Sequence, residues 1–294
     1  MTEPKPSWLA SPKKPALRLP PGACDAHCHV FGPQQRFPYA ENAPFAPADA
    51  PKEALFALHG MLGIARCVIV QSSCHGFNND VTADAIAAKN GAYRGIALLP
   101  PTAAEAELRR LDAQGFCGVR FNFMQHLGRA TPLEEVIRFG ARLADLGWHL
   151  QVYLESSLLQ EMAPVLKKSP VPVVIDHMGR VDASLGIDQP AFRQLLALMQ
   201  DERFHLKVSG SERISRRAAP YEDAIPFGRK LVSEFGDRVF WGTDWPHPNI
   251  PGSIPDDGVL VDLLSEIAPT EAARQALLVD NPRRFYRFPI DAVK

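Results

Sequence analysis

The seven residues Val171-Pro-Val-Val-Ile-Asp-His177 contain the pattern on which the fold depends. Their first five positions are apolar throughout, without the alternation of apolar and polar residues that marks a strand with one face in water. An unbroken apolar run of this length is expected for a strand that is covered on both faces, as in a parallel sheet beneath helices. The run ends in an acid and an imidazole, so this covered strand brings polar side chains to its carboxyl end.

Seven other short, β-branched apolar runs recur along the chain at a steady interval. The eight predicted strands cover residues 23–31, 67–71, 95–99, 118–123, 149–154, 171–177, 205–210 and 239–245. Helical periodicity marks residues 82–89, 103–114, 133–146, 157–168, 192–199 and 224–235. The mean spacing from the second strand to the eighth is about 29 residues, close to one strand–helix unit. There is no Gly-x-Gly-x-x-Gly turn, so the pattern predicts an α/β fold, a single-domain (β/α)8 TIM barrel over residues 22–294.

The composition narrows the possible partners. The 294 residues carry 32 Lys+Arg and 33 Asp+Glu, a net charge of −1, and 46% of them are hydrophobic. A chain with this balance and no basic stripe is not expected to bind nucleic acid. Its apolar runs are too short to cross a membrane, and residues 1–22 lack the apolar core of a signal peptide. Five cysteines at irregular spacing indicate no disulfide framework, so we expect a reduced, cytoplasmic protein that acts on a small molecule.

Proline is the unusual residue type, with 27 of 294 positions. Six prolines fall within residues 1–21, which we interpret as a Pro-rich N-terminal extension that precedes the barrel. Five more fall within residues 32–51, directly after the first predicted strand. In a barrel that stretch would lie over the catalytic face, and its prolines would stiffen it. The alternative interpretation is a mobile connector.

Polar side chains gather where the first, sixth and eighth strands end. Alternation along a strand places His27 and His29 on one face, with Cys28 on the other. His177 ends the sixth strand, and Asp244 lies at the end of the eighth. Barrel enzymes place their sites at the carboxyl ends of the strands, so three imidazoles and one carboxylate should converge at one mouth. A lone histidine is usually structural, but four such residues on strand ends indicate a catalytic centre.

The same motifs carry a family resemblance. Asp-Ala-His27-Cys-His29-Val-Phe, Val-Ile-Asp-His177-Met-Gly and Trp-Gly-Thr-Asp244-Trp-Pro-His resemble the amidohydrolase superfamily. From about Pro20 to Tyr286 the chain is similar to the branch that contains the 2-pyrone-4,6-dicarboxylate lactonases. The resemblance implies hydrolysis of a carboxylated cyclic ester, with 2-pyrone-4,6-dicarboxylate opened to 4-oxalomesaconate (4-carboxy-2-hydroxymuconate). The setting would be bacterial catabolism of lignin-derived aromatics by the protocatechuate 4,5-cleavage route, with Asp244 activating water.

A substrate of that kind carries two carboxylates, which need cationic partners. Arg120 at the end of the fourth strand and Arg213 after the seventh are the candidates, because a guanidinium binds a carboxylate through two parallel hydrogen bonds. Ser73, His75 and Tyr153, at the ends of the second and fifth strands, could add hydrogen bonds.

The sequence departs from this branch at two positions. His126 stands where the lactonases tend to carry a further arginine, and Phe45 stands where a tyrosine hydroxyl is expected. Loss of a cation and a donor weakens the binding of a dianion unless Arg129 or a protonated His126 substitutes. With these two departures the substrate could instead be an altered lactone, such as 4-sulfomuconolactone.

No cofactor is expected. Binuclear amidohydrolases place Lys or Glu on strand four and His on strand five, whereas these strand ends offer Arg120 and Tyr153. The pyrone lactonases that the sequence resembles work without a metal. The alternative is the zinc ion that the sulfomuconolactone hydrolases use, since imidazoles and a carboxylate suit zinc. Its ligands would be His27, His29, His177 and Asp244.

Other activities stay open at this point. A lactone isomerase or a decarboxylase of the same superfamily would use a related barrel, although decarboxylases generally need a metal and an acidic ligand near the first-strand motif. A barrel that only binds a small acid is the non-enzymatic alternative. Asp244 argues against it, because a further anion opposes the binding of two carboxylates. The oligomeric state does not follow from the sequence.

Overall fold

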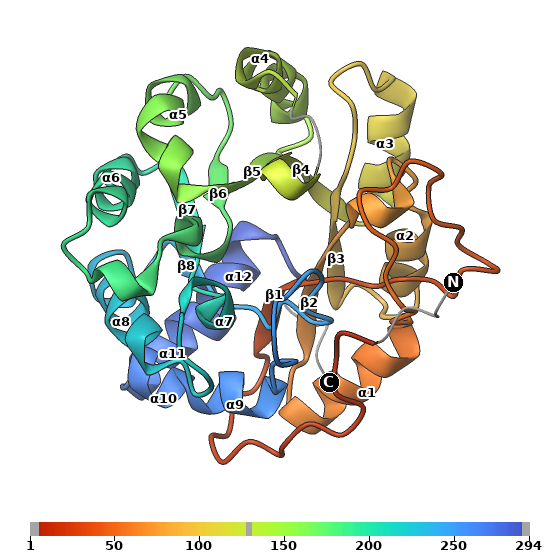
Figure 1. Ribbon diagram of the computed structural model, residues 1–294. Coiled ribbons are helices and arrows are strands. Elements are labelled where there is room, and N and C mark those ends of the chain that lie inside the picture. Colours follow the sequence, from red (N-terminus) through yellow and green to blue (C-terminus); the bar gives the residue numbers. More distant parts are fainter. Residues whose placement is uncertain (1–5, 128–130, 290–294) are drawn as a thin grey trace.

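The computed structural model describes residues 6–127 and 131–289, and in it eight parallel strands form a barrel ringed by helices (Figure 1). The strands are β1 (Cys24–Cys28), β2 (Arg66–Val70), β3 (Tyr93–Ala97), β4 (Phe116–Phe123), β5 (His149–Leu154), β6 (Val173–Ile175), β7 (Phe204–Lys207) and β8 (Val239–Phe240). Each strand pairs with the next along the chain. Backbone hydrogen bonds from Ala26 N to Trp241 O (2.8 Å) and from Asp244 N to His27 O (2.7 Å) link the two end strands. The predicted (β/α)8 barrel is confirmed.

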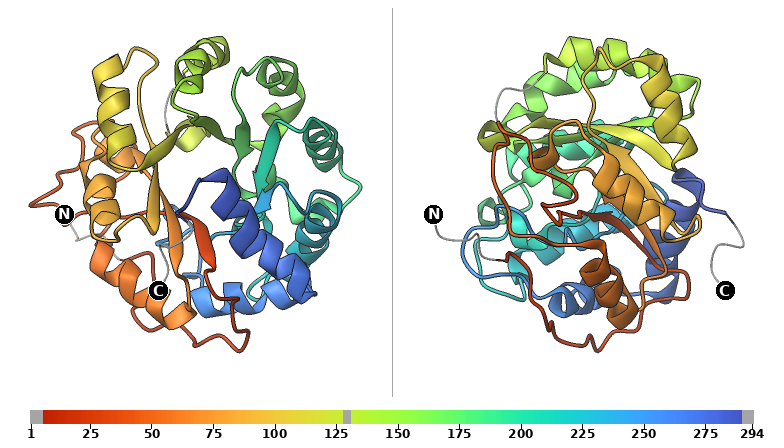
Figure 2. Two further views of the ribbon diagram at one scale, coloured as in Figure 1. Left: turned by 180° about the vertical axis from the view of Figure 1, so that it is seen from behind. Right: turned by 90° about the vertical axis from the view of Figure 1, so that its right-hand side faces the viewer.

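The helices lie around the outside of the sheet (Figure 2). They are α1 (Lys52–Leu62), α2 (Asp80–Ala87), α3 (Glu105–Ala113), α4 (Leu133–Ala144), α5 (Leu159–Leu166), α6 (Pro190–Met199), α7 (Ser211–Ile214), α8 (Ile225–Glu234), α9 (Asp257–Asp262), α10 (Leu264–Ile267), α11 (Glu271–Gln275) and α12 (Asn281–Phe285). Short helical turns η1 (Ser73–His75), η2 (Gln125–Leu127) and η4 (His177–Arg180) follow β2, β4 and β6. Every residue of β2, β5 and β6 is buried, as expected for strands covered on both faces.

Six strands are shorter at their carboxyl ends than the apolar runs predict, by one residue at β2, two at β3 and three at β7, which ends at Lys207. β1 ends at Cys28, β6 at Ile175 and β8 at Phe240. The chain leaves the barrel wall at these points, and its backbone becomes left-handed at His177 (φ 47°) and Asp244 (φ 62°). A strand cannot include such residues, so the predicted ends at 177 and 245 were too long. The predicted end at 31 was also too long, because the pairing of β1 with β2 ends at Cys28.

The two ends of the barrel differ in chemistry. At one end, α12 crosses the opening, and Tyr286 and Phe288 join Val68, Val174 and Phe240 in an apolar cluster (Figure 2). The carboxyl ends of the strands lie at the opposite end, where the polar residues gather. A closed apolar base leaves one mouth for a ligand.

The N-terminal segment, residues 6–22, passes outside the barrel. Trp8 packs its ring 5.4 Å from that of Trp245, and the backbone N–H of Lys13 donates to the carboxylate of Asp256 (2.9 Å). All five cysteines are buried and unpaired. Within the described residues, no helix combines the length and apolar character that a membrane span requires.

Candidate active site

His27 and His29 extend from the end of β1 toward the mouth of the barrel, and Cys28 lies on the other face, as alternation predicts. His29 places Nδ1 2.7 Å from the carbonyl oxygen of Val70. A carbonyl only accepts, so Nδ1 carries the hydrogen and the lone pair of neutral His29 is on Nε2. His27 is fully buried, and its Nδ1 lies 3.1 Å from the Nζ of Lys207.

Asp25 joins the two strands that carry most of these residues. Its Oδ1 accepts hydrogen bonds from the backbone N–H groups of His27 (3.0 Å) and Thr243 (3.1 Å), and its Oδ2 accepts from the Thr243 hydroxyl (2.5 Å). His59 adds a fourth contact to Oδ2 at 3.2 Å. Since Thr243 immediately precedes Asp244, this buried carboxylate fixes the spacing between β1 and the acid after β8.

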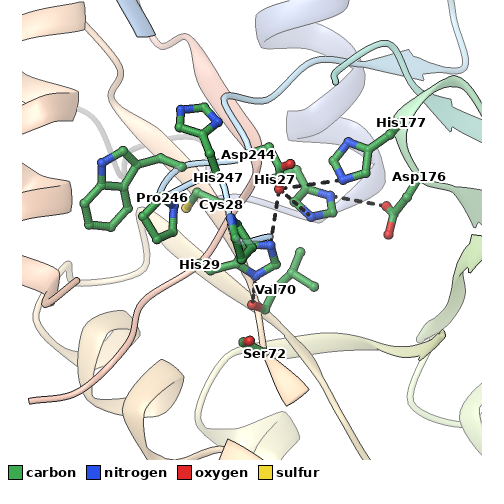
Figure 3. Close-up of polar contacts among 12 residues, drawn as sticks. His27, Cys28, His29, Val70, Ser72, Asp176, His177, Asp244, Pro246 and His247 are labelled. Carbon is green, nitrogen blue, oxygen red and sulfur yellow. Dashed lines mark hydrogen bonds and ion pairs between the residues drawn. The ribbon is translucent and has the colours of Figure 1, made fainter. Parts of the chain in front are cut away.

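Three imidazoles converge on one carboxylate oxygen (Figure 3). The Nε2 atoms of His29, His27 and His177 lie 3.3, 3.6 and 3.7 Å from Asp244 Oδ1. The other oxygen, Oδ2, accepts a hydrogen bond from Nε of Arg213. All four residues of this cluster are at most 3% exposed. The structure therefore brings together the four predicted catalytic residues.

Burial sets the charge state of this cluster. It lowers the pKa of His27, His29 and His177, so these imidazoles are neutral at pH 7. Burial would raise the pKa of Asp244, but the Arg213 guanidinium and the nearby histidines outweigh it and hold that pKa well below its usual range. An ionised carboxylate among neutral imidazoles can accept a proton from water.

The same cluster has the donor set of a metal site. One ligand atom each from His27, His177 and Asp244 lies within 4.8 Å of the others. His27 Nε2 and Asp244 Oδ1 are buried without a hydrogen-bond partner. Neutral imidazole nitrogens and a carboxylate oxygen are ligands that a zinc-like ion prefers, so by type and distance these residues could hold one ion.

A pocket opens above the cluster. Its lining is formed by His29, Phe45, Ser72, Ser73, Arg120, Asn122, His126, Leu127, Tyr153, His177, Arg213, Asp244, Pro248 and Asn249. Eight of the ten predicted site residues are among them. His27 lies below the lining, and His75 lies outside it.

Arg120 forms the wall opposite β1. Its Nε lies 3.1 Å from Asp176 Oδ2, and its guanidinium carbon lies 4.6 Å from the centre of the Tyr153 ring. The ion pair and the ring hold the guanidinium in place at the pocket, which Arg120 lines. The guanidinium carbon of Arg180 lies 5.9 Å from the centre of the same ring.

His75 contacts the Pro-rich loop instead of the pocket. Its Nδ1 lies 3.1 Å from Pro38 O, and its Nε2 accepts from the N–H of Gly32 at 3.4 Å. A backbone bridge between Phe31 and Ala50 joins the ends of the loop, and Phe45 reaches the pocket. The loop therefore contributes to the site through Phe45, and a direct role for His75 stays a prediction.

The resemblance predicts an arginine where this chain has His126. His126 does not supply the missing positive charge. Burial lowers its pKa, and Arg180 and Arg213 lower it further, so the ring is neutral at pH 7. The other substitute, Arg129, lies outside the described residues.

Several polar residues of the site were not singled out from the sequence. Lys207 and Asp176 are completely buried beneath the pocket, and Gln151 lies between them. Each follows or interrupts an apolar strand, which is the same signal that identified Arg120. Arg180 gave no such signal, because it lies in the turn after β6.

The fold and this site define an amidohydrolase. The amidohydrolase family model matches residues 24–288, and the chain belongs to that family. Its relatives include a 2-pyrone-4,6-dicarboxylate hydrolase of Comamonas testosteroni, 44% identical over 95% of this chain and 94% of that protein. A 4-sulfomuconolactone hydrolase of Hydrogenophaga intermedia is 38% identical over 91% and 89% of the two chains. A solved probable 2-pyrone-4,6-dicarboxylic acid hydrolase of Acinetobacter baumannii, with citric acid bound, covers 91% of this chain and 100% of its own, at 28% identity and a TM-score of 0.80.

Proposed function

We propose that this protein hydrolyses a carboxylated lactone, with 2-pyrone-4,6-dicarboxylate as the substrate and 4-oxalomesaconate as the product. The observation that carries the proposal is an ionised Asp244 among three neutral imidazoles, at the base of a pocket that also holds two arginines. The 44% identical 2-pyrone-4,6-dicarboxylate hydrolase of Comamonas testosteroni supports the choice of substrate.

In this proposal Asp244 is the general base. It takes a proton from water as the water oxygen bonds to the lactone carbonyl carbon. The ring C–O bond then breaks, and the proton passes to the released ring oxygen. His29 and His177 line the pocket beside Asp244. The lone pair on His29 Nε2 would accept a hydrogen bond from the water. The Ser209 hydroxyl would donate to His177 Nδ1, 3.0 Å away, so that the Nε2–H of His177 faces the developing oxyanion.

The two substrate carboxylates would be held by the arginines. Arg120 and Arg213 each already have an acidic partner, Asp176 and Asp244, and so retain some N–H groups for a ligand. Within residues 6–127 and 131–289, no carboxylate lies within 4.0 Å of the Arg180 guanidinium. The guanidinium lies beside the Tyr153 ring. We propose Arg180 as a third cation, in place of the neutral His126.

A second candidate is a related lactone hydrolase that uses one zinc ion, as the 38% identical 4-sulfomuconolactone hydrolase makes reasonable. Two residues favour this candidate. His126 is neutral and lacks the positive charge of an arginine, and Phe45 lacks the hydroxyl of a tyrosine, so both bind a dianion less well. A zinc ion held by His27, His29, His177 and Asp244 would polarise the lactone carbonyl as a Lewis acid. We propose that the protein works without it.

The deciding experiment is incubation with 2-pyrone-4,6-dicarboxylate and, separately, with 4-sulfomuconolactone, before and after prolonged chelation. We expect loss of the pyrone absorbance at an unchanged rate after chelation. Faster opening of the sulfonated lactone, abolished by chelation, would favour the second candidate. Binding of both compounds without ring opening would contradict lactone hydrolysis altogether.

We also propose a cytoplasmic location. Five buried cysteines that remain unpaired support a reducing compartment. Detection of the protein after cell fractionation tests this directly.

A further inference from the structure

Lys207 is the one lysine beneath the active site whose side chain is completely buried in the described part of the chain. It ends β7 and lies below the pocket lining. Its Nζ is 2.8 Å from Gln151 Oε1, 3.1 Å from His27 Nδ1 and 3.5 Å from Asp176 Oδ1. Three polar neighbours therefore surround an amine that has no contact with solvent.

The donor count at Lys207 fixes the hydrogen positions around it. A lysine ammonium has three N–H donors and no acceptor, so each of its three neighbours must accept. Gln151 is oriented for this, because its Nε2 donates to Asp176 Oδ2 at 3.1 Å and leaves Oε1 toward Lys207. The remaining donor is directed at His27 Nδ1, which must then be the nitrogen without a hydrogen.

A neutral imidazole carries one N–H, so His27 has its hydrogen on Nε2. Its neighbour His29 has the opposite tautomer, because its Nδ1 donates to Val70 O. The Nε2–H of His27 faces Asp244 Oδ1 at 3.6 Å, beyond hydrogen-bond distance, and both atoms are buried without a hydrogen-bond partner. Two histidines two residues apart therefore play different parts.

We propose that Lys207 is a positioning residue that keeps the hydrogen of His27 on Nε2, facing Asp244, and thereby withholds the lone pair of His27 from metal coordination. A metal binds the lone pair of an imidazole nitrogen, and the lone pair of His27 faces Lys207 instead. For its effect on turnover this inference rests on the proposed function, whereas its effects on the His27 tautomer and on metal binding do not.

The site also contains the alternative arrangement. Asp176 Oδ1 lies 3.2 Å from His27 Nδ1. Without the lysine amine, Nδ1–H can donate to that carboxylate, and the lone pair then moves to Nε2, facing His177 and Asp244. A carboxylate behind a histidine is the arrangement that orients metal-binding imidazoles. Removal of Lys207 should thus turn the lone pair of His27 toward His177 and Asp244, where His27 can serve as a metal ligand.

The test compares K207M with the wild type and with K168M, which removes an exposed lysine. K207M should fold, because Asp176 keeps its ion pair with Arg120. After exposure to zinc and gel filtration, we expect K207M to hold about one zinc ion per chain with at least about tenfold tighter binding than wild type and K168M. Before zinc is added, its kcat should fall about tenfold with little change in KM.

Nitrogen-15 NMR reports the tautomer of His27 in the wild type itself. A variant is needed only to assign the His27 signals. With the His27 signals assigned by His27→Gln, we expect a protonated Nε2 and an unprotonated Nδ1. A protonated Nδ1 would overturn the proposal, and so would zinc binding by K207M no tighter than by wild type. If K207M does not fold, the NMR result decides. If the lactone is not a substrate, the tautomer and the zinc affinity still decide, so the two proposals fail separately.

Discussion

The two halves of the pocket are held in different ways. The reaction end, formed by His27, His29, His177 and Asp244, lies where β1, β6 and β8 leave the barrel and is almost completely buried. The binding rim includes Phe45, Ser73 and His126, which come from a long loop and two short turns. The first half depends on closure of the barrel itself, whereas the second depends on segments that can change without disturbing the strands.

That difference separates chemistry from substrate choice. The buried Asp25 ties His27 to Thr243, so the reaction end cannot shift without breaking contacts between β1 and β8. Among the residues that the structure describes, 6–127 and 131–289, no hydrogen bond or ion pair links Phe45 to His126. We therefore propose that lactone chemistry depends on the reaction end, and that the choice among lactones depends on the binding rim.

The largest expected effect is on the reaction end. Asp244→Asn keeps the size of the side chain but removes the proton acceptor, and we expect kcat to fall by roughly a thousandfold or more. Affinity for the dicarboxylate should be unchanged or higher, because one negative charge leaves the pocket. Single-turnover rates and equilibrium binding of the substrate measure the two effects. Unchanged turnover would place the base elsewhere.

The next effect concerns a cation on the barrel wall, between the reaction end and the binding rim. Arg120→Met removes a charged hydrogen-bonding partner, which is worth about 1.5–3 kcal/mol, and we expect KM to rise roughly tenfold to a hundredfold. The fold should tolerate the change because Asp176 keeps Lys207 at 3.5 Å. Arg142→Met, at a partly exposed arginine far from the pocket, is the matched control. A fall in kcat with an unchanged KM would show that Arg120 acts on the reaction instead.

Arg213 belongs to both halves and gives a prediction in pH. It holds the pKa of Asp244 well below 3.8, so the base stays ionised as pH falls through the ordinary carboxylate range. The acid limb of kcat/KM should lie below that value in the wild type, with no inflection near the imidazole value of 6.5. In Arg213→Met the pKa of Asp244 rises, so the acid limb should move to higher pH. An unmoved limb would mean that Arg213 does not control the base.

The sequence predicted one half of the pocket better than the other. The eight apolar runs were enough for the barrel, and His27, His29, His177 and Asp244 followed because strand ends meet at one mouth. Lys207 and Asp176 could not be placed, because their contacts cross the barrel interior and depend on the register of β5, β6 and β7. His75 was assigned to the pocket for its position after β2, yet the turn η1 directs it to the Pro-rich loop. Side-chain direction beyond a strand end does not follow from strand periodicity.

The smallest expected effect tests whether the reaction end is held from within. The N-terminal segment touches it from outside, through Trp8 on Trp245, the residue after Asp244. If Asp25 and His27 position Asp244, Trp8→Ala should lower the free energy of unfolding by about 1–3 kcal/mol through lost apolar contact. It should change kcat by less than about threefold, because the inner contacts remain. Thermal melts and initial rates measure both. A tenfold loss of kcat in a protein that still melts cooperatively would mean that the extension is part of the support for the catalytic base, so that the reaction end is held from both sides.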